Sequence, residues 1–296
     1  MIVVSAWVNA WAKINIDLRV LARRADNYHE LRTIFQTISL ADSIGIEYQP
    51  SDCIEIEIQG NVTIEDNLIA RATRLVMEHI GLTGRIRFTL EKRIPMGAGL
   101  GGGSADAAAV LRTLPKVIGV AIAPARLHQM AASLGSDVPF FLYGGTAVGL
   151  GRGDEVYPLR DLASLHGLLV TPGIHISTPD AYRALSARIS ADSQPAKLSD
   201  FAAVVWTEDL TLARNDFEEV VFEMHPELDR IRHALENAGA VCARMTGSGS
   251  SIFGLFRERP PNLDLSHRVH PFSFVSRPEY QSYFDSSVSP TNRELD

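Results

Sequence analysis

The stretch PMGAGLGGGSADAAAVL, residues 95–111, decides how this chain folds. It begins at the proline that ends RIRFTLEKRIP (85–95), whose alternation of apolar and polar residues predicts a strand. Five of the seven residues from Gly97 to Gly103 are glycines, and an alanine-rich run typical of a helix follows them. Unpaired N–H groups at a helix N-terminus bind phosphate, and glycines let the phosphate oxygens come close. The segment predicts a strand, a phosphate-binding loop and a helix, with a flexible turn as the alternative.

The glycine loop differs from the common nucleotide-binding loops. No Gly-Lys-Ser or Gly-Lys-Thr follows the glycines, which excludes a Walker A loop. Gly97, Gly99 and Gly102 match the G-x-G-x-x-G pattern of dinucleotide-binding folds, but residues 107–136 contain no Asp or Glu to bind the ribose. The chain also lacks the HRD and DFG motifs of protein kinases. If the loop binds phosphate, it therefore does so in a protein of another class.

Hydrophobic periodicity predicts alternating strands and helices on both sides of this loop. In the first half, residues 1–20, 44–49 and 53–60 have the alternation of strands, and residues 65–80 form one amphipathic helix that Gly81 stops. A short helix at 124–134, a loop with an apolar segment at 135–145 and a hairpin at 145–159 complete this half.

The second half has a mixed pattern of the same kind. We expect a strand at 165–173, a helix from Thr178 with that residue as its cap, helices at 215–225 and 226–239, and strands at 242–246 and 251–256. The pattern weakens from Arg257 onward. Residues 281–296 are polar and unpatterned, and we expect them to be a disordered tail.

Length and composition limit the possible functions. The 296 residues suffice for two domains at about 150 residues each. A net charge of −7 provides no basic surface for nucleic acid or an anionic membrane. The two cysteines, Cys53 and Cys242, lack metal or disulfide spacing and suit a reducing compartment, so we expect a cytoplasmic protein. No basic residue precedes the apolar run of MIVVSAWVNAWAK, so we expect no export signal, and no window matches a membrane span.

Residues Pro95–Ala105, PMGAGLGGGSA, resemble the central phosphate loop of the GHMP kinases, which phosphorylate small-molecule hydroxyls with ATP. Ala10–Asp42, Gly135–Asp154 and Met245–Phe256 resemble, in the same order, motifs of one branch whose acceptor carries a cytidine diphosphate group. The resemblance implies an α+β fold of two domains. These are an N-terminal ATP-binding domain (1–160), ribosomal-protein-like, and a ferredoxin-like C-terminal domain (161–280).

Three positions depart from the family pattern. Trp11 stands where the family usually has Pro, and Asn27 stands where it usually has Gly. Residues 257–270 replace a usual helix with a segment that carries Pro260 and Pro261. The last departure leaves open how the second domain ends.

The resemblance also implies site residues. Lys13 and Asp137 would be the catalytic pair, since phosphoryl transfer needs a group for the hydroxyl proton and positive charge for the phosphoryl oxygens. MgATP would be held by the glycine loop, with the Ser104 hydroxyl as a candidate Mg²⁺ contact, and no carboxylate ligand stands out. The implied ATP-binding residues are Pro95, Met96, Gly97, Ala98, Gly99, Leu100, Gly101, Gly102, Gly103, Ser104, Ala105 and Asn67, and the implied substrate-binding residues are Asn15, Tyr28, His29, Thr178 and Tyr182.

Plainer interpretations exist for several of these residues. Spacing alone favours a surface lysine at a strand end for Lys13 and a cap of a helix or turn for Asp137, and only the motif context reverses this. For Asn67, capping of a helix fits nearly as well as a contact with adenine. Gly247–Ser251 is either a second glycine turn near the site or a simple turn between strands.

Two alternatives to the main hypothesis remain at this point. One is a GHMP kinase for homoserine, mevalonate or a sugar, and the aromatic NYHEL segment (27–31) argues against it because those acceptors carry no base. The other is a catalytically silent nucleotide-binding protein. The sequence leaves the oligomeric state open.

Overall fold

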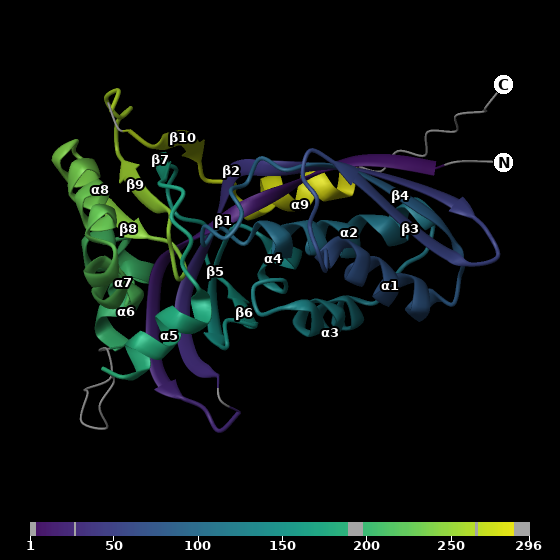
Figure 1. Cartoon of the computed structure of the whole chain (residues 1–296), viewed down its shortest axis with the longest axis horizontal. Coiled ribbons are helices and arrows are strands. Elements are labelled where there is room, and N and C mark those ends of the chain that lie inside the picture. The colour runs from purple at the N-terminus through teal and green to yellow at the C-terminus, as the bar shows by residue number, and fades with distance from the viewer. Residues whose placement is uncertain (1–3, 27, 189–197, 264–265, 287–296) are drawn as a thin grey trace.

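Two long strands organise the computed structural model, which describes residues 4–26, 28–188, 198–263 and 266–286. β1 (Val4–Arg23) and β2 (His29–Pro50) pair antiparallel along their length. Figure 1 shows them running along the first half, bending at the junction between the halves and continuing along the second half to a tip near α5. The sequence predicted most of β1, at 1–20, but only the last part of β2, at 44–49. His29, in the NYHEL segment, begins β2, and the departure at Asn27 lies outside the described residues.

The first half contains a six-stranded sheet with helices on one face. Its order is β3-β4-β2-β5-β6, with β1 paired to β2 beside that path. Figure 1 shows α1, α2 and α3 together beneath this sheet. The further elements are β3 (Ile54–Gly60), α1 (Leu68–Ile80), β4 (Gly84–Glu91), α2 (Gly102–Ile118), α3 (Pro124–Leu134), α4 (Phe140–Tyr143), β5 (Thr146–Gly151) and β6 (Glu155–Pro158).

Strict alternation places β4 between the helices and solvent. Ile86, Phe88 and Leu90 are buried in the core that α1 and α2 share, whereas the intervening residues are exposed. On the exposed face Arg85 and Arg87 pair with carboxylates of β3. Burial of a large apolar side chain contributes about 1.5–3 kcal/mol, more than an exposed ion pair does, so the helix-facing side holds the sheet together.

The second half contains a four-stranded antiparallel sheet of order β10-β7-β9-β8. In chain order this is fourth-first-third-second, the order of a ferredoxin-like sheet, which confirms the expected fold class. Helices α7 and α8 pack against it (Figure 1). Its elements are β7 (His166–Thr171), α5 (Thr178–Ser186), α6 (Leu198–Thr207), a 3₁₀ turn η1 (Leu210–Leu212), α7 (Phe217–Met224), α8 (Pro226–Asn237), β8 (Cys242–Met245), β9 (Ile252–Phe256) and β10 (Arg268–Ser273).

Between β9 and β10 the described residues contain no helix. Pro260 and Pro261 account for this, because proline lacks the N–H that a helix interior needs and restricts the residue before it. The described residues of this segment are therefore non-helical, in line with the departure noted in the sequence.

The expectation of a disordered tail from residue 281 is wrong for its first six residues. Arg277–Ser286 form α9, whose Tyr280 and Phe284 are buried. The Trp11 ring lies 5.2 Å from that of Tyr280 and 6.0 Å from that of Phe284, measured between centroids. The helix therefore packs on the first half of the molecule. Residues 287–296 lie outside the described residues.

Candidate active site

The glycine loop has a backbone that only glycine adopts without strain. Gly97, Gly99 and Gly101 have φ values of 65°, 78° and 69°, in the left-handed region. A Cβ added to Gly99 would lie 2.0 Å from the carbonyl oxygen of Thr246, so a side chain has no room there. Gly101 is the N-cap of α2 and supplies no side-chain oxygen to its first N–H groups. Those groups can receive phosphate oxygens, and the predicted strand, loop and helix are confirmed.

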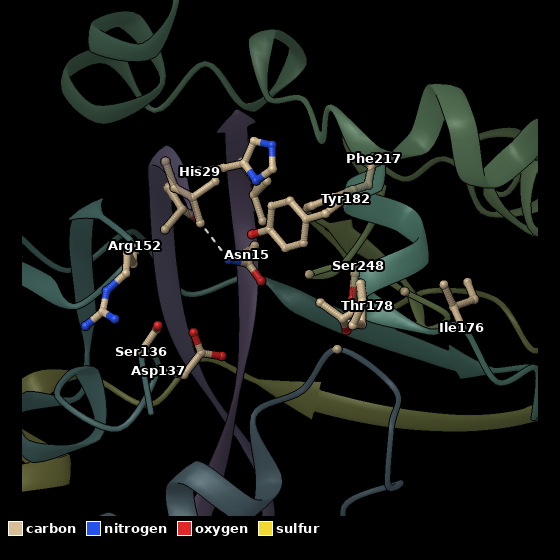
Figure 2. Close-up of a pocket in the computed structure, with 18 of the residues that line it drawn as sticks. Asn15, His29, Ser136, Asp137, Arg152, Ile176, Thr178, Tyr182, Phe217 and Ser248 are labelled. Carbon is tan, nitrogen blue, oxygen red and sulfur yellow. Dashed lines mark hydrogen bonds between the residues drawn. The ribbon is translucent and has the colours of Figure 1, made fainter. Parts of the chain in front are cut away.

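A turn of the second half packs directly on this loop. Thr246 donates its hydroxyl to the carbonyl oxygen of Gly99 at 3.1 Å, and the N–H of Ser251 donates to that of Ala98 at 3.4 Å. The segment Gly247–Ser251, predicted as a turn near the site, thus lies against the loop. A cavity of about 970 Å³ opens beside it, lined by β1, the loop, residues 136–137, α5 and this turn. Figure 2 shows the side chains that converge on this cavity.

Lys13 and Asp137 meet inside the cavity. The Lys13 ammonium lies 2.7 Å from Oδ1 of Asn15, 3.0 Å from the carbonyl oxygen of Gly99 and 3.4 Å from the Asp137 carboxylate. Lys13 is 3% exposed, whereas the Asp137 side chain is one-third exposed and faces the cavity (Figure 2). The interpretation of Lys13 as a surface residue is therefore wrong. A buried cation surrounded by oxygens is well placed to hold further negative charge.

Asn15 is held in place from two sides. Its Oδ1 accepts from Lys13, and its Nδ2 donates to Oγ1 of Thr33 at 2.8 Å, the contact drawn in Figure 2. It lies on the same face of β1 as Lys13, as its spacing of two residues predicts. With both amide atoms occupied and 2% of its surface exposed, its side chain is rigid.

Stacked aromatic rings line the far end of the cavity (Figure 2). The rings of His29 and Tyr182 are 4.8 Å apart and inclined by 20°, and the edge of Phe217 meets Tyr182 at the same separation. His29 Nε2 lies 2.6 Å from the Ser186 hydroxyl. Burial and the charge of Arg23 lower the pKa of His29, and burial raises the pKa of Tyr182. Both rings are therefore neutral near pH 7 and form an apolar shelf.

Tyr28 and Thr178 also reach the cavity, with partners that the sequence did not reveal. Tyr28 is 54% exposed, and the Arg152 guanidinium lies 4.9 Å from the centre of its ring. The Thr178 hydroxyl lies 2.8 Å from that of Ser248. Thr178 is the first residue of α5 and Ser177 its N-cap, so the prediction that Thr178 caps this helix is off by one residue.

Asn67 lies elsewhere. Its Oδ1 accepts the N–H of Ile69 at 2.9 Å and caps α1, as the plainer interpretation of the sequence has it. It is not one of the residues that line the cavity. Its expected contact with adenine stays a prediction. Trp11 also packs away from the cavity, against α9, and is not one of the residues that line the cavity.

Sequence analysis missed several residues of the cavity wall: Thr33, Phe35, Ser136, Arg152, His175 and Phe217. Ser136 and Arg152 lie within the quoted motif Gly135–Asp154, and that position was an available signal. Phe35 also lies within a quoted motif, but apolar residues within strands and helices, such as Phe35 and Phe217, are usually core.

Two negative findings apply to the part of the chain that the structure describes. No group of three or more His, Cys, Asp or Glu residues is placed to hold a metal ion. No helix there has the length and apolar character needed to cross a membrane.

Comparison with known proteins places these features in a family. The model of the GHMP kinases N terminal domain matches residues 67–145, and that of the GHMP kinases C terminal domain matches residues 207–267. A 4-diphosphocytidyl-2-C-methyl-D-erythritol kinase of Solibacter usitatus (strain Ellin6076) is 48% identical over 97% of this chain and 94% of the relative. One of Thermotoga petrophila is 39% identical over 85% of this chain and 92% of the relative.

Solved structures agree with the sequence relatives. A crystal structure of 4-(cytidine 5'-diphospho)-2C-methyl-D-erythritol kinase matches with a TM-score of 0.77 and 35% identity, over 90% of this chain and 98% of that one. A homoserine kinase from Cytophaga hutchinsonii matches with a TM-score of 0.67 at 18% identity, over 92% of this chain and 95% of that one, which reflects the shared fold alone. The chain belongs to the 4-diphosphocytidyl-2-C-methyl-D-erythritol kinase family of the GHMP kinases.

Proposed function

We propose that this chain transfers the γ-phosphoryl group of ATP to the 2-hydroxyl of 4-diphosphocytidyl-2-C-methyl-D-erythritol, giving the 2-phosphate and ADP for isoprenoid synthesis by the non-mevalonate route. The observation that carries the proposal is the meeting of Lys13 with both Asp137 and the glycine loop, at 3.4 Å and 3.0 Å. One cation thus adjoins the candidate proton acceptor and the loop that would bind the phosphates.

Each part of the site has its own role in the proposed phosphoryl transfer. The 2-hydroxyl oxygen forms a bond to the γ-phosphorus while the bond from that phosphorus to the β–γ bridging oxygen breaks, and ADP leaves. Asp137 accepts or orients the hydroxyl proton, and Lys13 offsets the negative charge of the phosphoryl oxygens. The first N–H groups of α2 steady the remaining phosphates.

Magnesium would bind together with ATP and be held mainly by its phosphates. Mg²⁺ keeps several waters and is held by substrate phosphates with one or two protein oxygens, so a site without a carboxylate cluster suits MgATP. Ser104, in the first turn of α2, is the hydroxyl that we propose as its protein contact. Bound magnesium would neutralise charge on the β- and γ-phosphates.

Cytosine recognition is the second part of the proposal. The His29–Tyr182 shelf supplies a flat apolar surface, and Tyr28 supplies an exposed ring at the rim of the cavity. A pyrimidine base stacks on such rings, and polar edges nearby select it by hydrogen bonding. Thr178 and Asn15 would contact the rest of the acceptor. Acceptors without a base make no use of these rings.

The proposal includes the arrangement of the protein and its location. Residues 1–160 would form the ATP-binding domain, and the acceptor would lie between it and the second domain. Both cysteines are free, Cys53 exposed and Cys242 buried, which suits a reducing cytoplasm.

The test is ADP release by the purified protein with MgATP and each of four acceptors: the cytidyl compound, homoserine, mevalonate and galactose. We expect turnover with the cytidyl compound alone and competitive inhibition by cytidine diphosphate. Turnover with another acceptor would overturn the cytosine pocket. Absence of turnover with all four, despite ATP binding, would support a silent nucleotide-binding protein.

A further inference from the structure

A cluster of three buried charges lies beneath the glycine loop, outside the cavity. Asp42 belongs to β2, Lys92 follows β4 and Asp106 belongs to α2. The Lys92 ammonium donates to the carboxylate of Asp42, and to Oδ2 of Asp106 at 2.8 Å. None of the three side chains is more than 5% exposed, and none lines the cavity. The proposed reaction does not use them.

Asp42 fixes the chain where it enters the loop. Its Oδ1 accepts the backbone N–H groups of Arg93, at 2.6 Å, and of Ile94, at 2.8 Å. Ile94 directly precedes Pro95, the first residue of the loop. The entry is thus tied to the rigid strand β2 by charge-assisted hydrogen bonds.

Lys92 joins this entry to the exit of the loop. Asp106 follows Lys92 by fourteen residues and lies in the second turn of α2. A Cβ added to Gly102 would lie 3.2 Å from the Lys92 ammonium, and one added to Gly101 would lie 3.2 Å from Cε of Lys13. The start of α2 is therefore held between the catalytic lysine on the cavity side and Lys92 on the buried side.

Opposing effects of burial and neighbouring charges act on the carboxyl of Asp106 in this cluster. Burial and the neighbouring Asp42 raise the pKa of Asp106 to about 7, although Lys92 opposes this. Oδ1 of Asp106 has no hydrogen-bond partner among the residues that the structure describes. A buried ion pair contributes little net stability, because desolvation offsets the attraction, yet removal of one partner is strongly destabilising. The geometry that the cluster imposes is thus its more distinctive contribution.

We propose that Lys92 is a positioning residue for nucleotide binding: by joining Asp42 to Asp106, it holds the first turn of α2 in the orientation that directs its N–H groups at the phosphates. This inference rests on the proposed function only in requiring that phosphates bind at that turn. The identity of the acceptor does not enter it.

The test measures MgADP binding by isothermal titration calorimetry, together with the thermal midpoint Tm, for variants of the full chain. Lys92→Met removes the tie and leaves two carboxylates facing each other, so we expect at least tenfold weaker binding and a lower Tm. The double variant Lys92→Met/Asp106→Asn also removes one of the two facing carboxylates, but the ammonium that joins positions 42 and 106 is still missing. We therefore expect Tm to recover by at least half while binding stays at least tenfold weakened.

Two further variants serve as controls. Asp106→Asn alone keeps an oxygen acceptor for Lys92, and we expect binding within threefold of the wild type. Arg93→Met changes the neighbouring residue, whose exposed side chain pairs with Glu91 at 2.7 Å, and we expect neither binding nor Tm to change.

The outcomes separate the two proposals. Wild-type affinity in Lys92→Met, or in the double variant as its Tm recovers, would show that the cluster only stabilises the fold, and would overturn the inference. Should Lys92→Met fail to fold, the double variant alone decides. Absence of MgADP binding by the wild type would instead contradict the proposed function.

Discussion

The Lys13 ammonium lies 3.4 Å from the Asp137 carboxylate, although the two residues are 124 positions apart along the chain. Lys13 is in the middle of β1, and Asp137 lies in the turn before α4. Both side chains line the cavity: Lys13 is buried in its wall, and the Asp137 carboxylate is partly exposed to it. A hydroxyl placed between Asp137 and the glycine loop would meet a proton acceptor and a bound phosphoryl group together.

Gly99→Ala tests how closely the two halves of the molecule approach at the loop. The added Cβ would lie 2.0 Å from the carbonyl oxygen of Thr246, and the φ of 78° disfavours any side chain. We expect at least tenfold weaker MgADP binding and a lower Tm. Gly119→Ala is the matched control, because its φ of 84° brings similar strain but nothing lies within 4 Å of the added Cβ. We expect it to lower stability by about 1 kcal/mol and leave binding unchanged. Equal binding by both variants would refute the steric argument.

Tyr28→Ala tests the aromatic rim of the cavity. Loss of a stacking ring costs about 1–3 kcal/mol per base, so we expect KM for the cytidyl acceptor to rise by about tenfold or more, with KM for ATP unchanged. Tyr157→Ala is the control, because Tyr157 has the same 54% exposure and does not line the cavity. An unchanged acceptor KM in Tyr28→Ala would remove Tyr28 from the binding site.

Glu218 makes the stability of the protein depend on pH. Burial raises its pKa to about 7, although its carboxylate accepts the N–H of Met245 at 2.7 Å. The folded state therefore binds more protons than the unfolded state between about pH 4.5 and 7, and this group adds stability as pH falls through that window.

Glu218→Gln keeps the acceptor for Met245 and removes the titration. We expect the variant to be more stable than the wild type by about 1–3 kcal/mol at pH 8 and to gain less stability between pH 8 and 5.5. Urea unfolding at the two pH values measures both effects. Parallel pH profiles for the two proteins would show that Glu218 is not the responsible group.

Phe284→Ala tests the packing of α9 on the first half. Phe284 is 1% exposed and meets Trp11, and removal of a buried phenylalanine costs about 3–5 kcal/mol. Urea unfolding should show this loss. Asp285→Ala breaks only an exposed pair with Lys116, and we expect less than about 1 kcal/mol. Equal stabilities would mean that the end of the chain contributes nothing to the core.

The sequence predicted those parts of the molecule whose signal is local. The glycine loop, α2, α3 and the strands β7, β8 and β9 follow from periodicity and from glycine chemistry, whereas α4 stands where a loop was expected and β10 was not predicted. Helix α9 escaped prediction because its buried side is only two residues, Tyr280 and Phe284, four positions apart in a polar segment. The partner that makes this spacing meaningful, Trp11, lies at the other end of the chain.

In the site too, some features could be predicted from the sequence and others depend on tertiary packing. Motif resemblance brought Lys13, Asp137 and the aromatic residues together correctly, since the structure places them in one cavity. The stacking of His29 on Tyr182 and the Arg152 contact with Tyr28 depend on tertiary packing. The Lys92 cluster also lacks a sequence signal, because one lysine and two aspartates spread over 65 positions resemble surface residues until the fold buries them.

The catalytic role of Asp137 is tested by kcat for Asp137→Asn with MgATP and 4-diphosphocytidyl-2-C-methyl-D-erythritol. Asparagine keeps the size of the side chain and loses the proton acceptor. We expect kcat to fall by about 10²–10⁴-fold, the contribution of general acid–base catalysis, with KM for both substrates within threefold of the wild type. Turnover of the variant at the wild-type rate would show that Asp137 is not the catalytic carboxylate.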